Sequence, residues 1–177
     1  MALYIRILAV FSIFLLSACT KLELLDLTIP NYGYNRTLNI AYGELPRQKL
    51  DIYMPENAGD APVPVIVFFY GGSWQRGAKA DYRFVGESLA KKGYVTIIAD
   101  YRLYPEVKFP AFVEDSALAV AWVHHHARDY GGDPKNLYVA GHSAGAYNAV
   151  MLAMDPQYLK AAGGSPRWIR GAIGLSG

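Results

Sequence analysis

The sequence predicts an α/β fold in which an antiparallel pair of strands precedes parallel strands that alternate with helices. Short apolar or alternating segments recur along the chain, and stretches with helical periodicity lie between them. Glycine and proline, with 17 and 10 residues, separate these segments at short intervals. Strands that alternate with helices imply a parallel sheet with right-handed crossover connections.

The first half of the pattern contains three strands and one helix. Residues 36–43 and 48–55 are alternating segments separated by ELPR, which predicts an antiparallel pair. Residues 63–72, VPVIVFFYGG, are a continuous apolar run, as expected for a strand buried on both faces. Residues 80–93 predict a helix, because they end in glycine with two lysines in the last turn, where the helix dipole favours cations.

The second half repeats this alternation. Residues 94–102 predict a buried strand. Residues 110–132 predict the clearest helix, with a proline in the first turn and apolar residues at helical spacing. Residues 136–141 form the next strand, which leads into a helix over 144–154. A loop then connects this helix to a last apolar strand at 168–177.

Composition and charge limit the class of protein. A chain of 177 residues that is 53% hydrophobic and 18% charged, without repeats, is expected to form at most one globular domain. The net charge is only +2 and no run of lysine and arginine is present, which argues against a nucleic-acid partner.

The first 18 residues are expected to be an export signal outside the domain. One positive residue, Arg6, precedes the uncharged run 7–18, which is too short to span a bilayer. The only cysteine and the three residues before it resemble the lipobox of bacterial lipoproteins, with the sequence Leu16-Ser17-Ala18-Cys19. The resemblance implies that Cys19 becomes the lipidated first residue of the mature chain.

A lipidated Cys19 would anchor the protein to the cell envelope through a tether of residues 19–35, followed by the domain of residues 36–177. Several acyl chains on one residue anchor firmly, and lipidation leaves no free thiol in an oxidising compartment. Thr20, which follows the cysteine, favours the outer membrane in the resembled Gram-negative lipoproteins. Two alternatives remain: a plain secretory signal, which gives a secreted or periplasmic soluble protein, and a retained membrane anchor.

The clearest candidate nucleophile is Ser143, in the G-x-S-x-G motif GHSAG. A buried strand is expected before it and a helix after it, as this motif requires. Gly141 and Gly145 flank the serine where side chains would collide with the neighbouring strand and helix. The helix N-terminus directs the N–H of Ala144 toward a developing oxyanion. The alternative is an idle serine in a glycine-rich turn.

A second motif, YGGSW at residues 70–74, predicts the rest of an oxyanion hole. Acyl transfer needs at least two N–H donors, each contributing about 3 kcal/mol to the transition state. By position, Gly72 and Ser73 are the expected donors, and Gly71 allows the turn. The alternative is an ordinary strand-to-helix loop.

Four motifs in register, YGGSW, DYRLYPEVKFP, DYGGDP and GHSAG, resemble the α/β-hydrolase superfamily. The resemblance is to the carboxylesterase branch with an HGGGW-type oxyanion loop, which includes hormone-sensitive-lipase-like and kynurenine-formamidase-like enzymes. It extends over residues 50–177. It implies an α/β-hydrolase fold and a small-molecule ester as substrate, with Ser143 as nucleophile and the amides of Gly72, Ser73 and Ala144 as oxyanion donors. It implies no metal ion and no cofactor.

The chain departs from the resembled pattern at Tyr70, where the family usually has a histidine that orients the oxyanion loop. A tyrosine hydroxyl is expected to serve instead. Asp100 and Arg102 are expected to be structural, bracing the loops beside the oxyanion hole.

A serine nucleophile of this family works with a carboxylate and a histidine in a catalytic triad, and no histidine base for Ser143 is found in this sequence. The expected order along the chain is Ser, then Asp or Glu, then His, yet no histidine follows Ser143 and the only later carboxylate is Asp155. His142 adjoins the serine, but its side chain is expected to diverge from it. His124–His126 are consecutive on a helix and point about 100° apart, which predicts a partly solvated helix face.

The sequence therefore predicts the amino-terminal portion of an α/β-hydrolase esterase that lacks the last strands. Without the histidine such a chain is expected to be almost inactive, because removing the histidine of a triad lowers the rate on the order of a million-fold. Two other classes remain open: a catalytically inactive, membrane-tethered binding module, and an amidase of the arylformamidase type.

Overall fold

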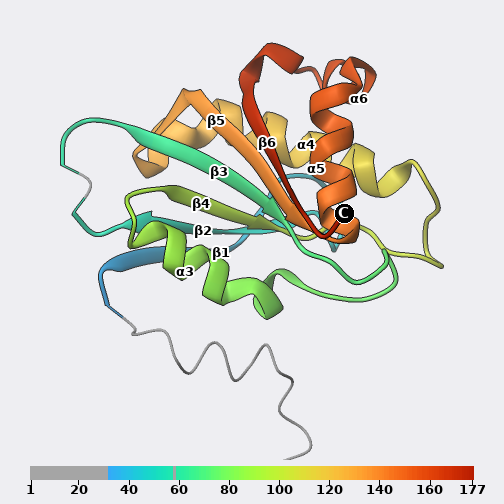
Figure 1. Cartoon of the computed structure of the whole chain (residues 1–177), viewed down its shortest axis with the longest axis horizontal. Coiled ribbons are helices and arrows are strands. Elements are labelled where there is room, and N and C mark those ends of the chain that lie inside the picture. Colours follow the sequence, from blue (N-terminus) through green and yellow to red (C-terminus); the bar gives the residue numbers. More distant parts are fainter. Residues whose placement is uncertain (1–31, 58) are drawn as a thin grey trace, which may run out of the picture. The chain divides into compact units, whose positions relative to one another are not determined.

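A computed structural model of the chain describes residues 32–57 and 59–177, which form one sheet with helices around it (Figure 1). The expected signal peptide, Cys19 and nearly all of the expected tether lie outside these residues. The strands are β1 Tyr34–Ala41, β2 Lys49–Pro55, β3 Val63–Phe69, β4 Val95–Ala99, β5 Gly132–His142 and β6 Ile169–Leu175. The helices are η1 Lys79–Tyr82, α3 Arg83–Ala90, α4 Ala111–His126, η2 Ala127–Tyr130, α5 Ala144–Met154, α6 Pro156–Ala161 and η3 Pro166–Trp168.

The sheet is mixed, with strand order β1-β2-β4-β3-β5-β6. β1 pairs with β2 in antiparallel register, which confirms the predicted strand pair. β4, β3, β5 and β6 run parallel to one another, as the alternation of strands and helices predicted. β1 begins at Tyr34, which pairs with Pro55, so the first strand includes the last residues of the expected tether.

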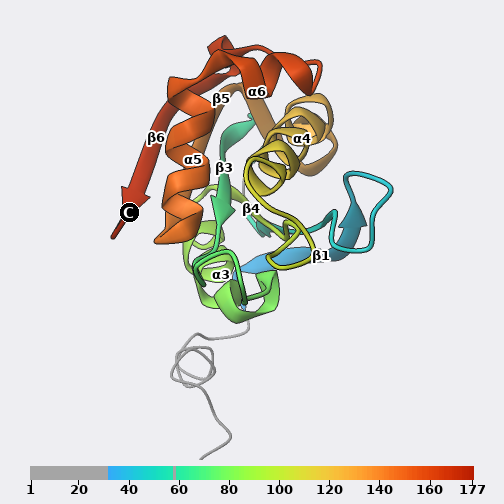
Figure 2. The ribbon, with the colours of Figure 1, turned by 90° about the vertical axis from the view of Figure 1, so that its right-hand side faces the viewer.

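The helices cover both faces of the sheet. Ile66 of β3 lines an apolar cavity with Phe84 of α3, whereas Ile97 of β4 faces Val123 of α4. Val67, next to Ile66, is the register partner of Ile97, and successive side chains on a strand point to opposite faces. α3 and α4 therefore lie on opposite faces. Figure 2 shows α4, α5 and α6 beside one another.

The central strands form the core, as their sequences predicted. All five residues of β4 are buried, and so are the last five of β3. On β6, which is an edge strand, Ile173 and Leu175 remain about half exposed. No helix in the described part of the chain is long and apolar enough to cross a membrane.

Several of the expected elements differ from those observed. The helix expected over 110–132 ends as an α-helix at His126 and continues as the 3-10 helix η2. β5 begins at Gly132, four residues before the expected start. The expected loop after α5 contains helix α6, which Asp155 caps by accepting a hydrogen bond from the amide of Gln157 at 3.1 Å.

Candidate active site

Ser143 occupies a strained turn between β5 and α5. Its φ of 51° and ψ of −118° lie in a region that non-glycine residues rarely adopt. The Ser143 amide donates to the carbonyl oxygen of Leu175 at 2.8 Å, and its own carbonyl accepts from the amides of Ala146 and Tyr147. Because α5 begins at Ala144, the serine lies directly at the helix N-terminus, where partial positive charge accumulates.

The two flanking glycines are required by space, as the sequence predicted. A Cβ on Gly141 would overlap the carbonyl of Gly145. A Cβ on Gly145 would overlap the carbonyl oxygens of Phe69 and Tyr70. The turn therefore packs directly against the end of β3 and the first residues of α5. This close packing excludes a side chain at either glycine position.

The loop after β3 lies directly against the serine turn. A Cβ on Gly71 would lie 3.1 Å from Cβ of Ser143. Three successive residues, Gly72, Ser73 and Trp74, have positive φ angles of 130°, 57° and 56°. This loop, residues 70–77, is called the oxyanion loop below.

The amides expected to bind the oxyanion are free of protein acceptors. Within residues 32–57 and 59–177, the N–H groups of Gly72, Ser73 and Ala144 make no backbone or side-chain hydrogen bond. The Ala144 amide has none because the first N–H groups of a helix lack an intrahelical partner. These three donors are thus available beside Ser143, and their role as oxyanion donors stays a prediction.

The oxyanion loop is held by Tyr70 together with Arg47, a residue that the sequence analysis did not identify. The Tyr70 side chain is fully buried, which raises the pKa of its hydroxyl and keeps it protonated. Nη2 of Arg47 donates to the Tyr70 hydroxyl at 2.7 Å and to the carbonyl oxygen of Gly77 at 2.8 Å. The hydroxyl of Tyr101 donates to the Tyr70 carbonyl at 2.7 Å. One guanidinium therefore connects the two ends of the loop.

Asp100 and Arg102 are structural, as expected. Oδ1 of Asp100 accepts from the amide of Lys79 at 2.8 Å, and burial raises the pKa of the Asp100 carboxyl. Arg102 forms a two-point ion pair with Asp115, with both distances 2.8 Å. Asp115 is fully buried and also accepts from Gln48 at 2.8 Å, so the loop after β4 is fixed to α4.

No described side chain is hydrogen-bonded to the Ser143 hydroxyl within residues 32–57 and 59–177. Nδ1 of His142 lies 2.7 Å from the hydroxyl of Tyr82, which directs this ring to another partner. Asp155 is engaged as the cap of α6. Within the described residues, His142 and Asp155 are therefore each engaged by a partner other than Ser143.

The three consecutive histidines lie at the C-terminal end of α4, where they belong to aromatic clusters. The His124 ring stacks on Trp168 with centroids 3.7 Å apart, and His125 meets the same indole edge-on at 5.3 Å. His126 stacks on Trp122 at 4.2 Å. His125 is exposed and its neighbours are half-buried, which confirms the partly solvated face, but the sequence did not predict the contact with Trp168.

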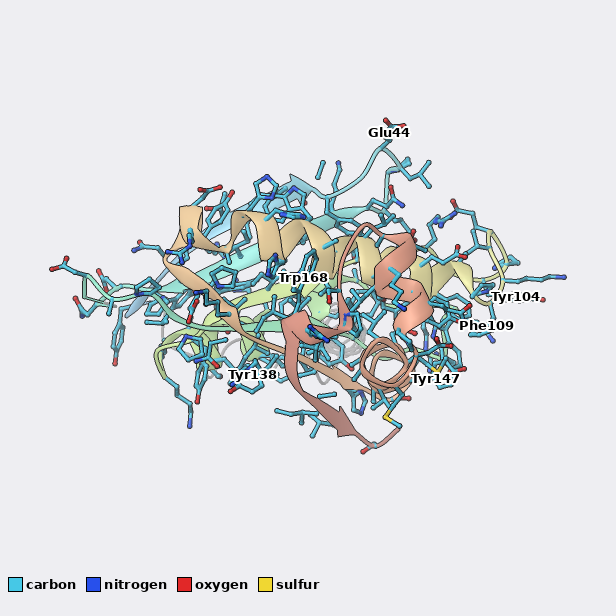
Figure 3. All side chains as sticks on the ribbon, turned by 90° about the horizontal axis from the view of Figure 1, so that it is seen from above. Glu44, Tyr104, Phe109, Tyr138, Tyr147 and Trp168 are labelled. Atoms are coloured by element: carbon cyan, nitrogen blue, oxygen red, sulfur yellow. The ribbon has the colours of Figure 1, made fainter. Side chains whose placement is uncertain are left out.

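A cavity of about 240 Å³ opens beside the oxyanion loop. Its lining is mainly aromatic: Ser73, Trp74, Gln75, Tyr104, Lys108, Phe109 and Phe112. The indole of Trp74 stacks on Phe112 at 5.2 Å, and its Nε1 donates to Oδ1 of Asn148 at 3.0 Å. Figure 3 shows Tyr104, Phe109 and Tyr147 gathered at one end of the molecule. No local sequence pattern predicts this cavity, because its walls come from separate segments of the chain.

Similarity to curated proteins points to esterases. The chain is 35% identical over 143 residues to an isoprenylcysteine alpha-carbonyl methylesterase of Arabidopsis thaliana, covering 78% of this chain and 33% of that protein. It is 33% identical over 129 residues to the esterase LipC of Mycobacterium tuberculosis, covering 71% of this chain and 32% of that protein. The chain thus spans about a third of the length of these relatives.

Solved structures agree. An esterase from Thermogutta terrifontis with bound propionate superimposes with a TM-score of 0.67 at 32% identity, covering 82% of this chain and 55% of that one. Esterase B from Lactobacillus rhamnosis superimposes with a TM-score of 0.73 at 21% identity, covering 98% of this chain and 56% of that one, and supports the fold alone. Residues 50–162 match the model of the BD-FAE family. The chain therefore belongs to the BD-FAE family, with the α/β-hydrolase fold of the carboxylesterases.

Proposed function

We propose that Ser143 is the nucleophile of a carboxylic-ester hydrolase that works through an acyl-enzyme. The observation that carries this proposal is the backbone of Ser143, held at φ 51° and ψ −118° at a helix N-terminus and against Gly71 of the oxyanion loop. Strain of this kind persists only where the surrounding structure imposes it, and it concentrates at functional sites. The esterase relatives support the same reaction class.

The proposed reaction has two steps. Oγ of Ser143 attacks the ester carbonyl, and the amides of Gly72, Ser73 and Ala144 donate to the oxyanion that forms. The alcohol leaves with a proton, and water then hydrolyses the acyl-serine. A histidine supported by a carboxylate would carry the proton in both steps. Neither of these two roles is assigned to any of the 177 residues.

The chain by itself is proposed to be a poor catalyst. A serine hydroxyl at neutral pH needs an adjacent base to attack efficiently. Loss of a triad histidine lowers kcat by about a million-fold, and what remains comes from the oxyanion donors and from binding. The same deficit favours the second candidate function, a binding module that keeps the site without turnover.

The substrate is proposed to be a small-molecule ester with an apolar or aromatic part. The aromatic cavity adjoins Ser73, one of the proposed oxyanion donors, so a group attached to the reacting carbonyl could lie between Trp74 and Phe109. Burial of apolar area on these rings contributes affinity without requiring further polar groups. Esters and amides are hydrolysed by the same acyl-transfer chemistry. A preference for esters over amides therefore depends on the leaving group.

Acyl transfer to Ser143 tests the proposal directly. The chain is incubated with p-nitrophenyl butyrate and imidazole, which acts as an external base, and butyryl groups are located by peptide mass spectrometry. We expect butyryl on Ser143 at a rate that rises with imidazole concentration, and none at this position in Ser143→Ala. Butyryl groups found only on lysines, at the same rate in both proteins, would refute the esterase mechanism and favour a binding module.

A further inference from the structure

Tyr82 connects the two halves of the proposed site. It is the last residue of η1, its side chain is 8% exposed, and its hydroxyl lies 2.7 Å from Nδ1 of His142. His142 ends β5 and immediately precedes Ser143. The proposed mechanism assigns no role to either of these two side chains.

Tyr82 also packs against the oxyanion loop, because its ring centroid lies 6.2 Å from that of Tyr70. Burial raises the pKa of the Tyr82 hydroxyl, and the nearby backbone N–H of Gly71 opposes that shift. With the protonated phenol as donor to Nδ1 of His142, the His142 proton lies on Nε2.

Gly71 is the point at which the loop and the serine turn meet. A Cβ on Gly71 would lie 2.8 Å from Nδ1 of His142 and 3.1 Å from Cβ of Ser143. A small shift of Gly71 therefore moves the free amides of the loop relative to the serine. Catalytic groups need placement within about 0.5 Å to act on a transition state.

Within the described part of the chain, one side-chain hydrogen bond connects the oxyanion loop itself to α5. Nε1 of Trp74 donates to Oδ1 of Asn148 at 3.0 Å. That link lies at the cavity end of the loop, whereas Tyr82 acts beside the serine. The ring of Tyr82 is itself fixed by Phe68 and Tyr70, at centroid distances of 5.5 and 6.2 Å.

We propose that Tyr82 is a positioning residue that fixes the oxyanion donors relative to Ser143, through its hydrogen bond to His142, which lies against Gly71 of the oxyanion loop. This inference rests on the proposed function, because it concerns the geometry of that same site. Tyr82 does not line the aromatic cavity, so it acts on the transition state and leaves binding of the apolar group unchanged.

A matched pair of variants separates this role from general stability. Tyr82→Phe removes the hydroxyl and keeps the ring. Tyr158→Phe makes the same change in α6, at a tyrosine that is also 8% exposed but lies outside the site. In nitrogen-15 NMR of the full chain, we expect the His142 ring to carry its proton on Nε2 in the unmodified protein and in Tyr158→Phe. We expect Tyr82→Phe to shift the Nδ1 resonance of His142.

Butylboronic acid measures the consequence for the site. Its boron bonds to Oγ of Ser143, the serine proton passes to imidazole in the buffer, and a hydroxyl on the tetrahedral boron mimics the oxyanion. Binding is followed by boron-11 NMR in the unmodified chain, Tyr82→Phe, Tyr158→Phe and Ser143→Ala. We expect Ser143→Ala to abolish the adduct, Tyr82→Phe to weaken it about tenfold, which corresponds to about 1.4 kcal/mol, and Tyr158→Phe to leave it unchanged.

The outcomes distinguish the two levels of the proposal. An adduct of equal affinity in Tyr82→Phe and the unmodified chain, or a His142 resonance that does not respond to Tyr82→Phe, overturns the positioning role and leaves the esterase proposal intact. An unmodified chain that forms no Ser143 adduct overturns the oxyanion site, and the positioning role is rejected with it. Equal weakening in both tyrosine variants also rejects the positioning role, since a change outside the site would then suffice.

Discussion

Nη2 of Arg47 lies 2.7 Å from the hydroxyl of Tyr70 and 2.8 Å from the carbonyl oxygen of Gly77. The oxyanion loop begins at one of these residues and ends at the other, so a single guanidinium fixes its span. The Arg47 Nε also donates to the carbonyl oxygen of Tyr101 at 3.0 Å. The tyrosine that replaces the histidine of the resembled family is thus matched by an arginine far from it in sequence.

We predict that Arg47→Met loosens the oxyanion loop and lowers the free energy of unfolding by about 2 kcal/mol, because hydrogen bonds to a charged group are lost from a half-buried site. Urea unfolding followed by tryptophan fluorescence measures this change. Arg167→Met, at an exposed arginine, is the control and should change stability by less than about 0.5 kcal/mol. Equal effects of the two substitutions would show that Arg47 does not brace the loop.

Gly145→Ala is expected to destabilise the protein by about 3 kcal/mol, because the added methyl overlaps backbone carbonyls of Phe69 and Tyr70 that cannot move aside easily. Gly174→Ala serves as the control, since its Cβ would meet only ordinary contacts, the nearest at 3.5 Å from Val150. Thermal unfolding of the two variants provides the comparison. A Gly145→Ala protein as stable as Gly174→Ala would contradict the tight turn described here.

Stability is expected to fall below about pH 6.5 because of His124. Burial, and then the charge of His125, lower the pKa of His124 from its ordinary value of 6.5. The unfolded chain therefore binds a proton at a higher pH than the folded chain. The contribution of His124 to stability is complete above pH 6.5 and is lost as the pH falls toward the lowered pKa.

His124→Phe keeps a ring against Trp168 and removes the titration. Its urea midpoint is expected to change less between pH 8 and pH 5 than that of the unmodified chain. A pH dependence as steep as in the unmodified chain would assign the effect to other groups.

Cys19→Ser tests the lipid anchor that the lipobox resemblance implies. Expressed in a Gram-negative host, the unmodified chain is expected in the outer-membrane fraction and to incorporate labelled palmitate. The variant is expected to incorporate none and to leave the membrane fraction. An unmodified chain that incorporates no palmitate would contradict the lipid anchor and leave the plain secretory signal or a retained anchor as the explanation.

Much of this fold and site could be predicted from local sequence patterns. The strand pair, the buried strands and the G-x-S-x-G turn depend on neighbouring residues, so alternation, apolar runs and glycine spacing were sufficient to predict them. The clash at Gly145 is an example: the residue must be glycine wherever a serine turn is packed this tightly.

The remaining features depend on contacts between residues far apart in the sequence, and local patterns could not predict them. Arg47 meets Tyr70 across 23 residues, and Tyr82 meets His142 across 60, so no periodicity in the sequence relates them. The cavity beside Ser73 combines the oxyanion loop with residues around Phe109, which only the folded sheet brings together. Helix α6 was missed because its 6 residues are too few for a helical pattern to emerge.

Labelling by paraoxon would show whether Ser143 is a nucleophile held beside oxyanion donors. The chain is treated with paraoxon in the presence of imidazole, and the diethylphosphoryl group is located by peptide mass spectrometry. We expect one label per chain, on Ser143, with labelling at this position lost in Ser143→Ala. Labels distributed over tyrosines and lysines, with Ser143 unmodified, would contradict it.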